Sequence, residues 1–573
     1  MIAQKSIFAA ALSILAAQST FTFAYWPNDP AINMVISEGA GEQSLPEVCP
    51  SIDGGCYISW YSTASGNYDV YLQRLDGGGT PQWQPNGILI DGHTQDTWIT
   101  DYDMTVDAGN NAIIVVNDIR AGTDRDIYAY KISPYGALIW GPDGVTISDN
   151  NGFEPDPRVA VTSLGNVVIA WQEEDIIHLR KLSPAGIDLW NPPIITLTGQ
   201  YGLSIPRIAP ADNDGVILQN LSATGPNWWS DKHLYIHKFD AAGNALWGGL
   251  TGIPVQTAGG FGVQMRPEVA SDGAGGAYCF WYDTRNNVHH VYAQRILANG
   301  TAAWEENGVI VSLTSGELQM YPQLVPLTAT NDILIFYLVT DGNQGLDGIK
   351  GQRISATGSR LWGDGGAVVI PQANLSLSAI YALPQFDGAI VTYVESPDDV
   401  NNCLIKGVRI GGDGYPIWPL SPITMCSSPS SKGHSAACLN ALSSVVEVWN
   451  DKRNDPAGDI YLQNINPDGS LGEAPIGISD NKSILPSSTL LSWSYPNPFN
   501  SSAIIGYLLR TPADVKIGIY DITGRRVSLT EISAQSAGRH SIFWDAANQP
   551  SGHYFCKIIA GDMVNTIEMT IVK

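Results

Sequence analysis

Three aspartate–arginine pairs, each spaced two residues apart, are the most conspicuous candidates for chemistry in this sequence: Asp118 and Arg120, Asp283 and Arg285, and Asp451 and Arg453. The middle pair lies in WYDTRNNVHHVYAQRILANGTAAW, residues 281–304, beside His289 and His290. Such a pair can brace a loop, because the aspartate caps a turn and also pairs with the arginine. Repetition favours bracing, since a catalytic group is needed at one convergent site only.

Further carboxylates near two of these pairs suggest calcium binding as an alternative. The loops DRD (124–126) and NDPAGD (454–459) place several acids close together. Calcium prefers oxygen ligands, although the spacing here is not that of an EF-hand. Bracing and calcium binding both stay open. The candidate calcium ligands are Asp118, Asp124, Asp126, Asp451, Asp455 and Asp459.

Familiar catalytic motifs are missing. The nine histidines form no HExxH or HxH motif, and no GxSxG, P-loop or dinucleotide motif occurs. His233 and His237 are four residues apart, but on a strand this spacing does not bring them together as it would on a helix. His289 and His290 face opposite sides of a strand. We therefore assign no catalytic residue.

The elements that position these side chains repeat along the chain. Tryptophans close similar segments at spacings of 57, 50, 57, 57, 58 and 56 residues, and Trp26 lies 57 residues before the first of them. A final copy has Leu471 at the corresponding place, which gives eight units between residues 26 and 471. A period of this size indicates a solenoid, a propeller or an array. The repeated tryptophans are Trp83, Trp140, Trp190, Trp247, Trp304, Trp362 and Trp418.

Each unit carries strand signals and no convincing helical period. Residues 265–283 predict a strand, a Gly-rich turn and a second strand; VYAQRI predicts a third, and TAAWEENGVIVS a fourth. Four short antiparallel strands in each of eight units predict an all-β, eight-bladed β-propeller over residues 25–479. Residues 26–37 are expected to form an outer strand, which can complete the last blade and hide two sheet edges. Residues 472–479 compete for that position.

In this arrangement the Asp–Arg loops join the second and third strands, and they open on the same face as the connections between blades. Ligands usually bind to propellers on that face. We keep Asp283 and Arg285 as candidate binding residues there. The regular tryptophans are best explained as core residues between sheets. The less regular Trp98, Trp228 and Trp229 are better candidates for exposed ligand contacts.

The N-terminus and the composition indicate export. Residues 1–24 have a lysine, a short apolar core and small residues before a cut after Ala24, as in a secretory signal peptide. The net charge of −25 argues against nucleic acid and anionic lipid partners. No later apolar segment reaches membrane-spanning length. Seven cysteines leave at least one thiol unpaired, and Cys49 and Cys56 could pair across a hairpin.

After a polar linker (480–490), residues 491–573 change pattern to about seven alternating strands, which fits a small immunoglobulin-like sandwich. The segments YPNPFN, VKIGIYDITGRRV, AGRHSIFWD, SGHYFCKI and the terminal MTIVK occur here in order. This tail resembles the C-terminal sorting domain of the type IX (Por) secretion system. The residues that carry the resemblance are Tyr495, Pro496, Asn497, Pro498, Phe499, Asn500, Gly524 and Lys573.

The resemblance implies recognition by the type IX secretion machinery, export across an outer membrane, and a secreted or surface-attached product. It does not imply what the propeller does. We expect a non-catalytic protein that binds protein or glycan outside the cell, with calcium as a candidate ligand. The alternative is a glycan-active hydrolase or lyase with a divergent site at the central mouth, although sialidase boxes and arginine clusters do not stand out. Carboxylates close together on facing blades would favour this alternative.

Overall fold

The computed structural model describes residues 26–573 apart from 96–101, 123, 263–264, 398–399, 420, 474–490, 496, 510–511, 536–537 and 562. The predicted signal peptide, the predicted linker and Trp98 lie outside the described residues. In the described part, η1 (Gly249–Thr251) is the sole helix and all other elements are strands. The predicted all-β fold class is therefore confirmed. None of the described segments forms a helix that could cross a membrane.

The described strands from Met34 to Ile465 form eight four-stranded sheets, numbered here 1 to 8. Sheet 1 has β2 (Gln43–Pro50), β3 (Cys56–Ser62), β4 (Asp69–Leu75) and β5 (Ile88–Asp91). Sheet 2 has β6 (Tyr102–Val106), β7 (Ala112–Asp118), β8 (Asp126–Ile132) and β9 (Val145–Thr146). Sheet 3 has β10 (Arg158–Val161), β11 (Val167–Glu173), β12 (Ile176–Leu182) and β13 (Ile194–Thr198). Sheet 4 has β14 (Leu203–Pro210), β15 (Val216–Ala223), β16 (Lys232–Phe239) and β17 (Ile253–Gln256).

The second half of the chain continues the same order. Sheet 5 has β18 (Glu268–Ser271), β19 (Ala277–Asp283), β20 (His290–Ile296) and β21 (Val309–Ile310). Sheet 6 has β22 (Glu317–Leu327), β23 (Asp332–Asp341), β24 (Asp347–Ile354) and β25 (Ala367–Ala373). Sheet 7 has β26 (Ser376–Gln385), β27 (Gly388–Ser396), β28 (Cys403–Ile410) and β29 (Ile423–Ser430). Sheet 8 has β30 (Lys432–Leu439), β31 (Val445–Asp451), β32 (Asp459–Ile465) and β1 (Met34–Ser37).

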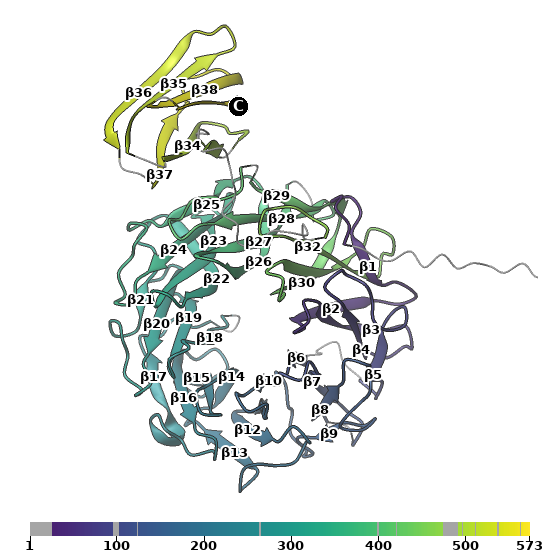
Figure 1. The fold of residues 1–573 in the computed structure, drawn as a ribbon. Helices are drawn as coiled ribbons and strands as arrows, with labels where there is room; N and C mark the ends of the chain where they lie inside the picture. Colours follow the sequence, from purple (N-terminus) through teal and green to yellow (C-terminus); the bar gives the residue numbers. More distant parts are fainter. Residues whose placement is uncertain are drawn as a thin grey trace, which may run out of the picture.

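The sheets stand around a ring in chain order, with the first strand of each sheet toward the centre (Figure 1). The second strand is the most deeply buried: every residue of β3, β7, β19 and β31 is buried. Each of these strands lies between two neighbouring sheets, which explains its continuous apolar sequence. The outermost strands can be as short as the two residues of β9 and β21.

The ring is closed by strands from its two ends. β1 pairs antiparallel with β32, so that Met34 lies opposite Leu462 and Val35 opposite Tyr461. Of the two segments that the sequence left open for this position, the N-terminal one therefore pairs with β32. The competing segment 472–479 lies almost entirely outside the described residues, from residue 474 onward. Closure hides the edge of β32, which would otherwise expose unpaired backbone groups.

The repeated tryptophans connect neighbouring sheets. They do not lie in the fourth strands as the sequence pattern suggested, but in the connection that leads to them. Each indole N–H donates to a backbone carbonyl in the matching turn of the next sheet, at 2.9–3.2 Å. Each ring also lies against the glycine of that turn, such as Trp304 against Gly358. Trp26 makes the corresponding contact with sheet 1 through Gly77 and Gly79, so the contacts run around the whole ring.

Gly358 allows a test of this contact. Its φ is +87°, and a Cβ added there would lie 2.9 Å from Cδ1 of Trp304. Gly66 has a φ of +88°, but an added Cβ would meet nothing within 4 Å. We expect Gly66→Ala to cost about 1–2 kcal/mol of unfolding free energy from backbone strain alone. Gly358→Ala should cost about 1–3 kcal/mol more, because the indole must move. Denaturant unfolding of both variants measures the difference, and equal costs would show that the indole adapts freely.

The cysteines are unpaired in this structure. Cys49 lies opposite Tyr57, and Cys56 lies opposite Pro50. The two cysteines are therefore one residue out of register, and neighbouring positions of a strand point to opposite faces. The suggested disulfide between Cys49 and Cys56 is wrong for this reason. Burial raises the pKa of the Cys49 thiol well above its usual value.

The C-terminal segment forms two sheets from seven strands. One sheet contains β33 (Leu491–Tyr495), β34 (Ser502–Leu509) and β37 (Gly538–Asp545). The other contains β36 (Arg526–Gln535), β35 (Ala513–Asp521), β38 (Gly552–Ala560) and β39 (Met563–Ile571). Alternate residues of these strands are buried between the sheets, as in the pattern of β38. Phe499 lies in this core against Trp544.

Candidate functional site

The three Asp–Arg pairs form similar structures, which we call the arginine braces. In sheet 5, Arg285 contacts Asp283 at 2.5 Å, and its guanidinium carbon lies 3.8 Å from the ring centre of Tyr292. A third contact runs from Arg285 Nη1 to the carbonyl oxygen of Asn307, at 2.8 Å. The arginine therefore ties the loop after the second strand to the turn before the fourth. The matching sets are Asp118, Arg120 and Tyr128 in sheet 2, and Asp451, Arg453 and Tyr461 in sheet 8.

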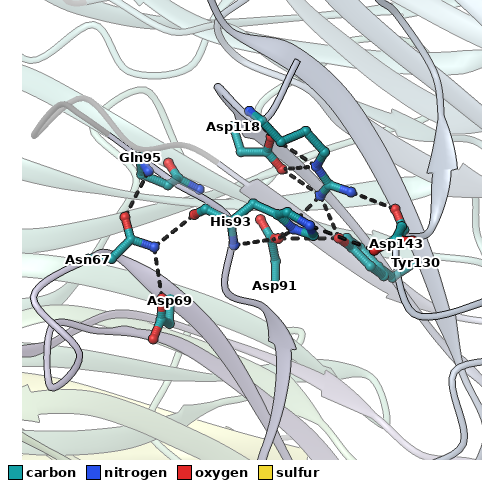
Figure 2. Close-up of polar contacts among 9 residues, drawn as sticks. Asn67, Asp69, Asp91, His93, Gln95, Asp118, Tyr130 and Asp143 are labelled. Carbon is teal, nitrogen blue, oxygen red and sulfur yellow. Dashed lines mark hydrogen bonds and ion pairs between the residues drawn. The ribbon is translucent and has the colours of Figure 1, made fainter. Parts of the chain in front are cut away.

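In sheet 2 the brace also contacts Asp91, at the end of β5 in sheet 1, which in turn contacts His93 (Figure 2). His93 Nδ1 lies 2.6 Å from Asp91 Oδ1, and Arg120 Nη2 lies 3.2 Å from the same oxygen. Tyr130 donates its hydroxyl to this oxygen at 3.2 Å. Burial raises the pKa of Asp91, and the neighbouring charge of Asp118 raises it further. Two carboxylates thus share one arginine.

A short chain of polar contacts extends from this group toward sheet 1. Asn67 donates to the carbonyl oxygen of His93 at 2.7 Å and to Asp69 at 2.8 Å, and it accepts from the backbone of Gln95 at 2.7 Å (Figure 2). Sequence reasoning missed Asp91 and His93. They come from a different repeat than Asp118, so spacing within one unit could not identify them.

The donor atoms around Asp118 do not suit calcium. Among the described residues, Asp91, His93 and Asp118 are the one acid–imidazole group whose ligand atoms all lie within 4.8 Å. Arg120 already contacts both carboxylate oxygens of Asp118. His93 offers nitrogen, whereas calcium takes six to eight oxygens. A cation here would have to displace the guanidinium.

The other predicted calcium ligands lie in the loops between the second and third strands, or begin the third strand, as Asp126 begins β8 and Asp459 begins β32. Burial raises the pKa of Asp126 to about 6, and the carboxylates of Asp124 and Asp149 contribute. In sheet 8, burial and Asp455 raise the pKa of Asp459. A bound cation would stabilise the ionised carboxylates of both groups. Among the described residues, however, neither set of three predicted ligands has its carboxylate oxygens within 4.8 Å of one another. Calcium binding by these residues stays a prediction.

The centre of the ring contains a cavity of about 430 Å³. It is lined by the first strands of sheets 1, 2, 7 and 8, and its polar side chains include Glu47, Asp103, Tyr381 and His434. Two carboxylates from adjacent sheets therefore face one cavity. Farther round the ring, Arg207 contacts Asp156 at 3.3 Å and Glu268 at 3.2 Å. These ion pairs connect the first strands of neighbouring sheets.

Two other acids with high pKa values are enclosed within the protein. Burial raises the pKa of Glu447 to about 8 and that of Glu154 to about 7. Neither carboxyl is accessible to solvent. Glu154 accepts from Asn150 at 2.7 Å and from the indole of Trp171 at 3.0 Å. A perturbed acid that a substrate cannot reach is a structural group rather than a catalytic one.

Trp228 and Trp229 are exposed, at 72% and 64% of their full accessible area. They belong to the loop between β15 and β16 and contact each other edge to face, with ring centres 5.6 Å apart. Large apolar side chains are usually removed from water, so an exposed pair at a loop tip indicates a contact surface. Trp98 lies outside the described residues.

A polar pocket of about 410 Å³ lies at the ends of the two strands that this loop connects. His233, Tyr235 and His237 all line it, because alternate residues of β16 share a face. The four-residue spacing of His233 and His237 did not predict that both would line one site. The sequence feature that indicates a shared site is the alternation of His233, Tyr235 and His237, because alternate residues of a strand point to the same face.

The sorting-motif residues meet the last strand of the chain. Asn497 accepts from the backbone N–H of Thr570 at 2.8 Å, and its side-chain amide donates to the carbonyl of Glu568 at 2.8 Å. The N–H of Phe499 donates to Thr570, and that of Val572 donates to Phe499. Gly524 turns the chain between β35 and β36 with a φ of +79°. The two ends of the predicted motif thus form one edge of the domain.

Residues 494–573 match the model of the secretion system C-terminal sorting domain. None of the curated proteins matches the chain in sequence.

Several solved structures are similar to the chain at low identity. PorZ, described as an essential bacterial surface component of the type-IX secretion system of Porphyromonas gingivalis, is 11% identical, with 95% of this chain and 87% of that one covered and a TM-score of 0.29. The Dos1 propeller is 11% identical, with 76% and 94% covered and a TM-score of 0.42. A GH43 endo-arabinanase from Bacillus licheniformis is 11% identical, with 48% and 98% covered and a TM-score of 0.25. Likeness at this level carries no argument about ligands or activity.

Proposed function

We propose that this protein, whose residues 494–573 are a secretion system C-terminal sorting domain, is an exported binding protein without catalytic activity. The sorting domain indicates a secreted or cell-surface protein handled by the type IX secretion machinery. In this proposal residues 1–24 are the signal peptide, residues 25–479 an eight-bladed propeller, and residues 480–490 the linker. Residues 491–573 are then an immunoglobulin-like sandwich. The propeller binds glycan or protein on the face that carries the loops between the second and third strands of its sheets.

The exposed Trp228–Trp229 pair carries this proposal. Indole rings supply flat apolar area for a sugar ring or a protein side chain, and they lose little conformational entropy on binding. The arginine braces support the same reading, because their charges are satisfied within each sheet or by its neighbour. They hold the loops in place and leave the tryptophans for the ligand.

Replacement of the tryptophan pair tests the proposal. We expect Trp228→Ala/Trp229→Ala to weaken binding of the full chain to immobilised extracellular polysaccharides and secreted proteins by about tenfold or more, as for removal of an interfacial aromatic hot spot. Tyr135→Ala is the control, because Tyr135 is 92% exposed and lies in a turn between the third and fourth strands. Binding measured by biolayer interferometry should be unchanged in the control. Equal binding by both variants would contradict a role for the tryptophan face.

One observation favours the alternative of a glycan-active hydrolase or lyase. Glu47 and Asp103 face the same central cavity, with His434 nearby. Pairs of carboxylates carry out glycoside hydrolysis when one holds a proton and the other does not. Incubation of the same polysaccharides with the full chain distinguishes the two functions. Release of oligosaccharides that is lost in Glu47→Gln or Asp103→Asn would replace the binding proposal with the enzymatic one.

A further inference from the structure

The pocket on sheet 4 occupies the place that an arginine fills in the braced sheets. Tyr235 pairs with Asn220 in sheet 4 as Tyr292 pairs with Trp281 in sheet 5. Two residues further toward the loop, Ser222 lies opposite His233, just as Asp283 lies opposite His290. Ser222 therefore stands at the aspartate position of the brace. Thr224, two residues later, stands at the arginine position.

Loss of the arginine uncovers the tyrosine. In the braced sheets the tyrosines under the arginines are 2–4% exposed. Tyr235, which has no arginine above it, is only partly buried and lines the pocket. The pocket of about 410 Å³ is within the usual range of small-molecule sites.

Sheet 1 provides an independent case of the same relation. It has Ser62 at the aspartate position and Ala64 at the arginine position, since Ser62 lies opposite Asp69. A smaller pocket of about 220 Å³ opens there, lined by Tyr71 and Trp60. Its tyrosine is also only partly buried. Absence of the arginine thus leaves a cavity over the tyrosine in two different sheets.

The lining of the sheet 4 pocket indicates the class of ligand. The described residues that line it include no aspartate, glutamate, lysine or arginine. Burial lowers the pKa of His237 to about 4, so this imidazole is neutral at neutral pH. The replacement of an aspartate by Ser222 removes the group that would neutralise a cationic ligand. The lining also offers no lysine or arginine for a carboxylate or phosphate.

The pocket instead combines an aromatic face with many uncharged hydrogen-bonding groups. Ser222 and Thr224 contribute two hydroxyls to the same lining as the Tyr235 ring. The amide of Asn220 lies beneath them, 1% exposed, and is bonded to His237 and to the carbonyl oxygen of Leu221. Hydroxyl-bearing rings suit such a lining, because their C–H faces pack on aromatic rings while their hydroxyls both donate and accept. Trp228 and Trp229, on the connecting loop, provide further aromatic area for neighbouring units of a chain.

We propose that this pocket binds one neutral sugar residue of an extracellular glycan, with the ring against Tyr235 and its hydroxyls on Ser222 and Thr224. This inference rests on the proposed binding function and narrows it to a ligand class and a site. In the three braced sheets an arginine guanidinium lies over the tyrosine ring. The same place in sheet 4 should therefore accept a group that lies against the ring of Tyr235.

Introducing an arginine by substitution, so that it fills the pocket of sheet 4, tests the proposal. Ser222→Asp/Thr224→Arg would recreate in sheet 4 the brace of sheet 5. The probes are neutral cello-, manno- and galacto-oligosaccharides, with oligogalacturonate as the acidic comparison, titrated calorimetrically into the full chain. We expect binding of a neutral oligosaccharide that becomes at least about tenfold weaker in the refilled variant and in Tyr235→Ala. The matched control is Ser62→Asp/Ala64→Arg in sheet 1, which should bind as the unmodified protein does.

The outcomes separate this inference from the proposed function. Neutral oligosaccharide binding that survives refilling but is lost in Trp228→Ala/Trp229→Ala would overturn the pocket and keep the tryptophan face. Binding of oligogalacturonate alone would overturn the neutral class. If no oligosaccharide binds the unmodified protein, the inference fails, and protein ligands of the tryptophan face then decide the proposed function. Thermal unfolding of the refilled variant at an unchanged or higher temperature shows that lost binding is not lost folding.

Discussion

Deletion of residues 26–37 is expected to lower the unfolding free energy of the ring by roughly 5–9 kcal/mol. The segment supplies Trp26, Met34 and Ile36, which are 4%, 7% and 5% exposed. Burial of each large apolar side chain contributes about 1.5–3 kcal/mol. The deletion also uncovers the edge of β32 and removes the contact of Trp26 with Gly79. We expect a large drop in melting temperature and concentration-dependent association through the free edge.

A point variant keeps this prediction testable if the deletion does not fold. Met34→Ala/Ile36→Ala should cost about 4–8 kcal/mol, since each large-to-small change in a core costs about 2–4 kcal/mol. Ile32→Ala is the control in the same segment, because Ile32 is 62% exposed. It should change stability by less than about 0.5 kcal/mol. A deletion that melts at the unmodified temperature would mean that another segment, such as residues 472–479, fills the position of β1.

Arg285→Ala is expected to destabilise the ring by about 3–5 kcal/mol. Asp283 is inaccessible to solvent, and Arg285 contacts both its carboxylate oxygens. Removal of the arginine side chain leaves a buried charge whose remaining partners are Gln256, the indole of Trp281 and the backbone N–H of residue 285. Breaking one side of a buried ion pair costs this amount because the other charge stays unpaired.

Two comparisons isolate the cause. Arg360→Ala removes an ion pair with Asp364, whose side chain is 77% exposed, together with one hydrogen bond to the carbonyl oxygen of Ile310, and should cost about 1–2 kcal/mol. In Arg285→Ala/Asp283→Asn the buried charge is gone, so we expect part of the stability to return. Denaturant unfolding followed by tryptophan fluorescence measures all three. A similar small loss for Arg285→Ala and Arg360→Ala would show that the brace contributes no more than a surface pair.

The sequence predicted the features that recur with its period. The tryptophan spacing located the sheets, because each tryptophan must reach the same turn of the next sheet. The order of strands within a unit made residues 26–37 one of two candidates for the strand that pairs with β32, and β1 is the one that does. The tail was recognisable from its motifs, and Asn497 and Phe499 lie where the chain end crosses them. These features depend on contacts whose partners stand at a fixed distance along the chain.

The features that sequence reasoning missed depend on differences between units. Asp91 joins the brace of the next sheet from an outer strand, and Gln256 is the corresponding neighbour of Asp283. Nothing in the spacing distinguishes these two residues as partners. The pocket over Tyr235 arises from what Ser222 and Thr224 lack. A missing arginine becomes visible only when the sequence of sheet 4 is compared with the repeats that have the arginine.

The tryptophan–glycine contacts have a consequence for how such a ring can arise. Each unit presents a donor surface, its tryptophan, on one side and an acceptor surface, its turn, on the other. This is a head-to-tail association, like that between subunits of a cyclic oligomer, but within one polypeptide. A unit gained by tandem duplication would bring both surfaces with it. Head-to-tail surfaces that do not close can polymerise without limit, whereas here Trp26 occupies the last free acceptor, so that the chain ends as a closed circle rather than a filament.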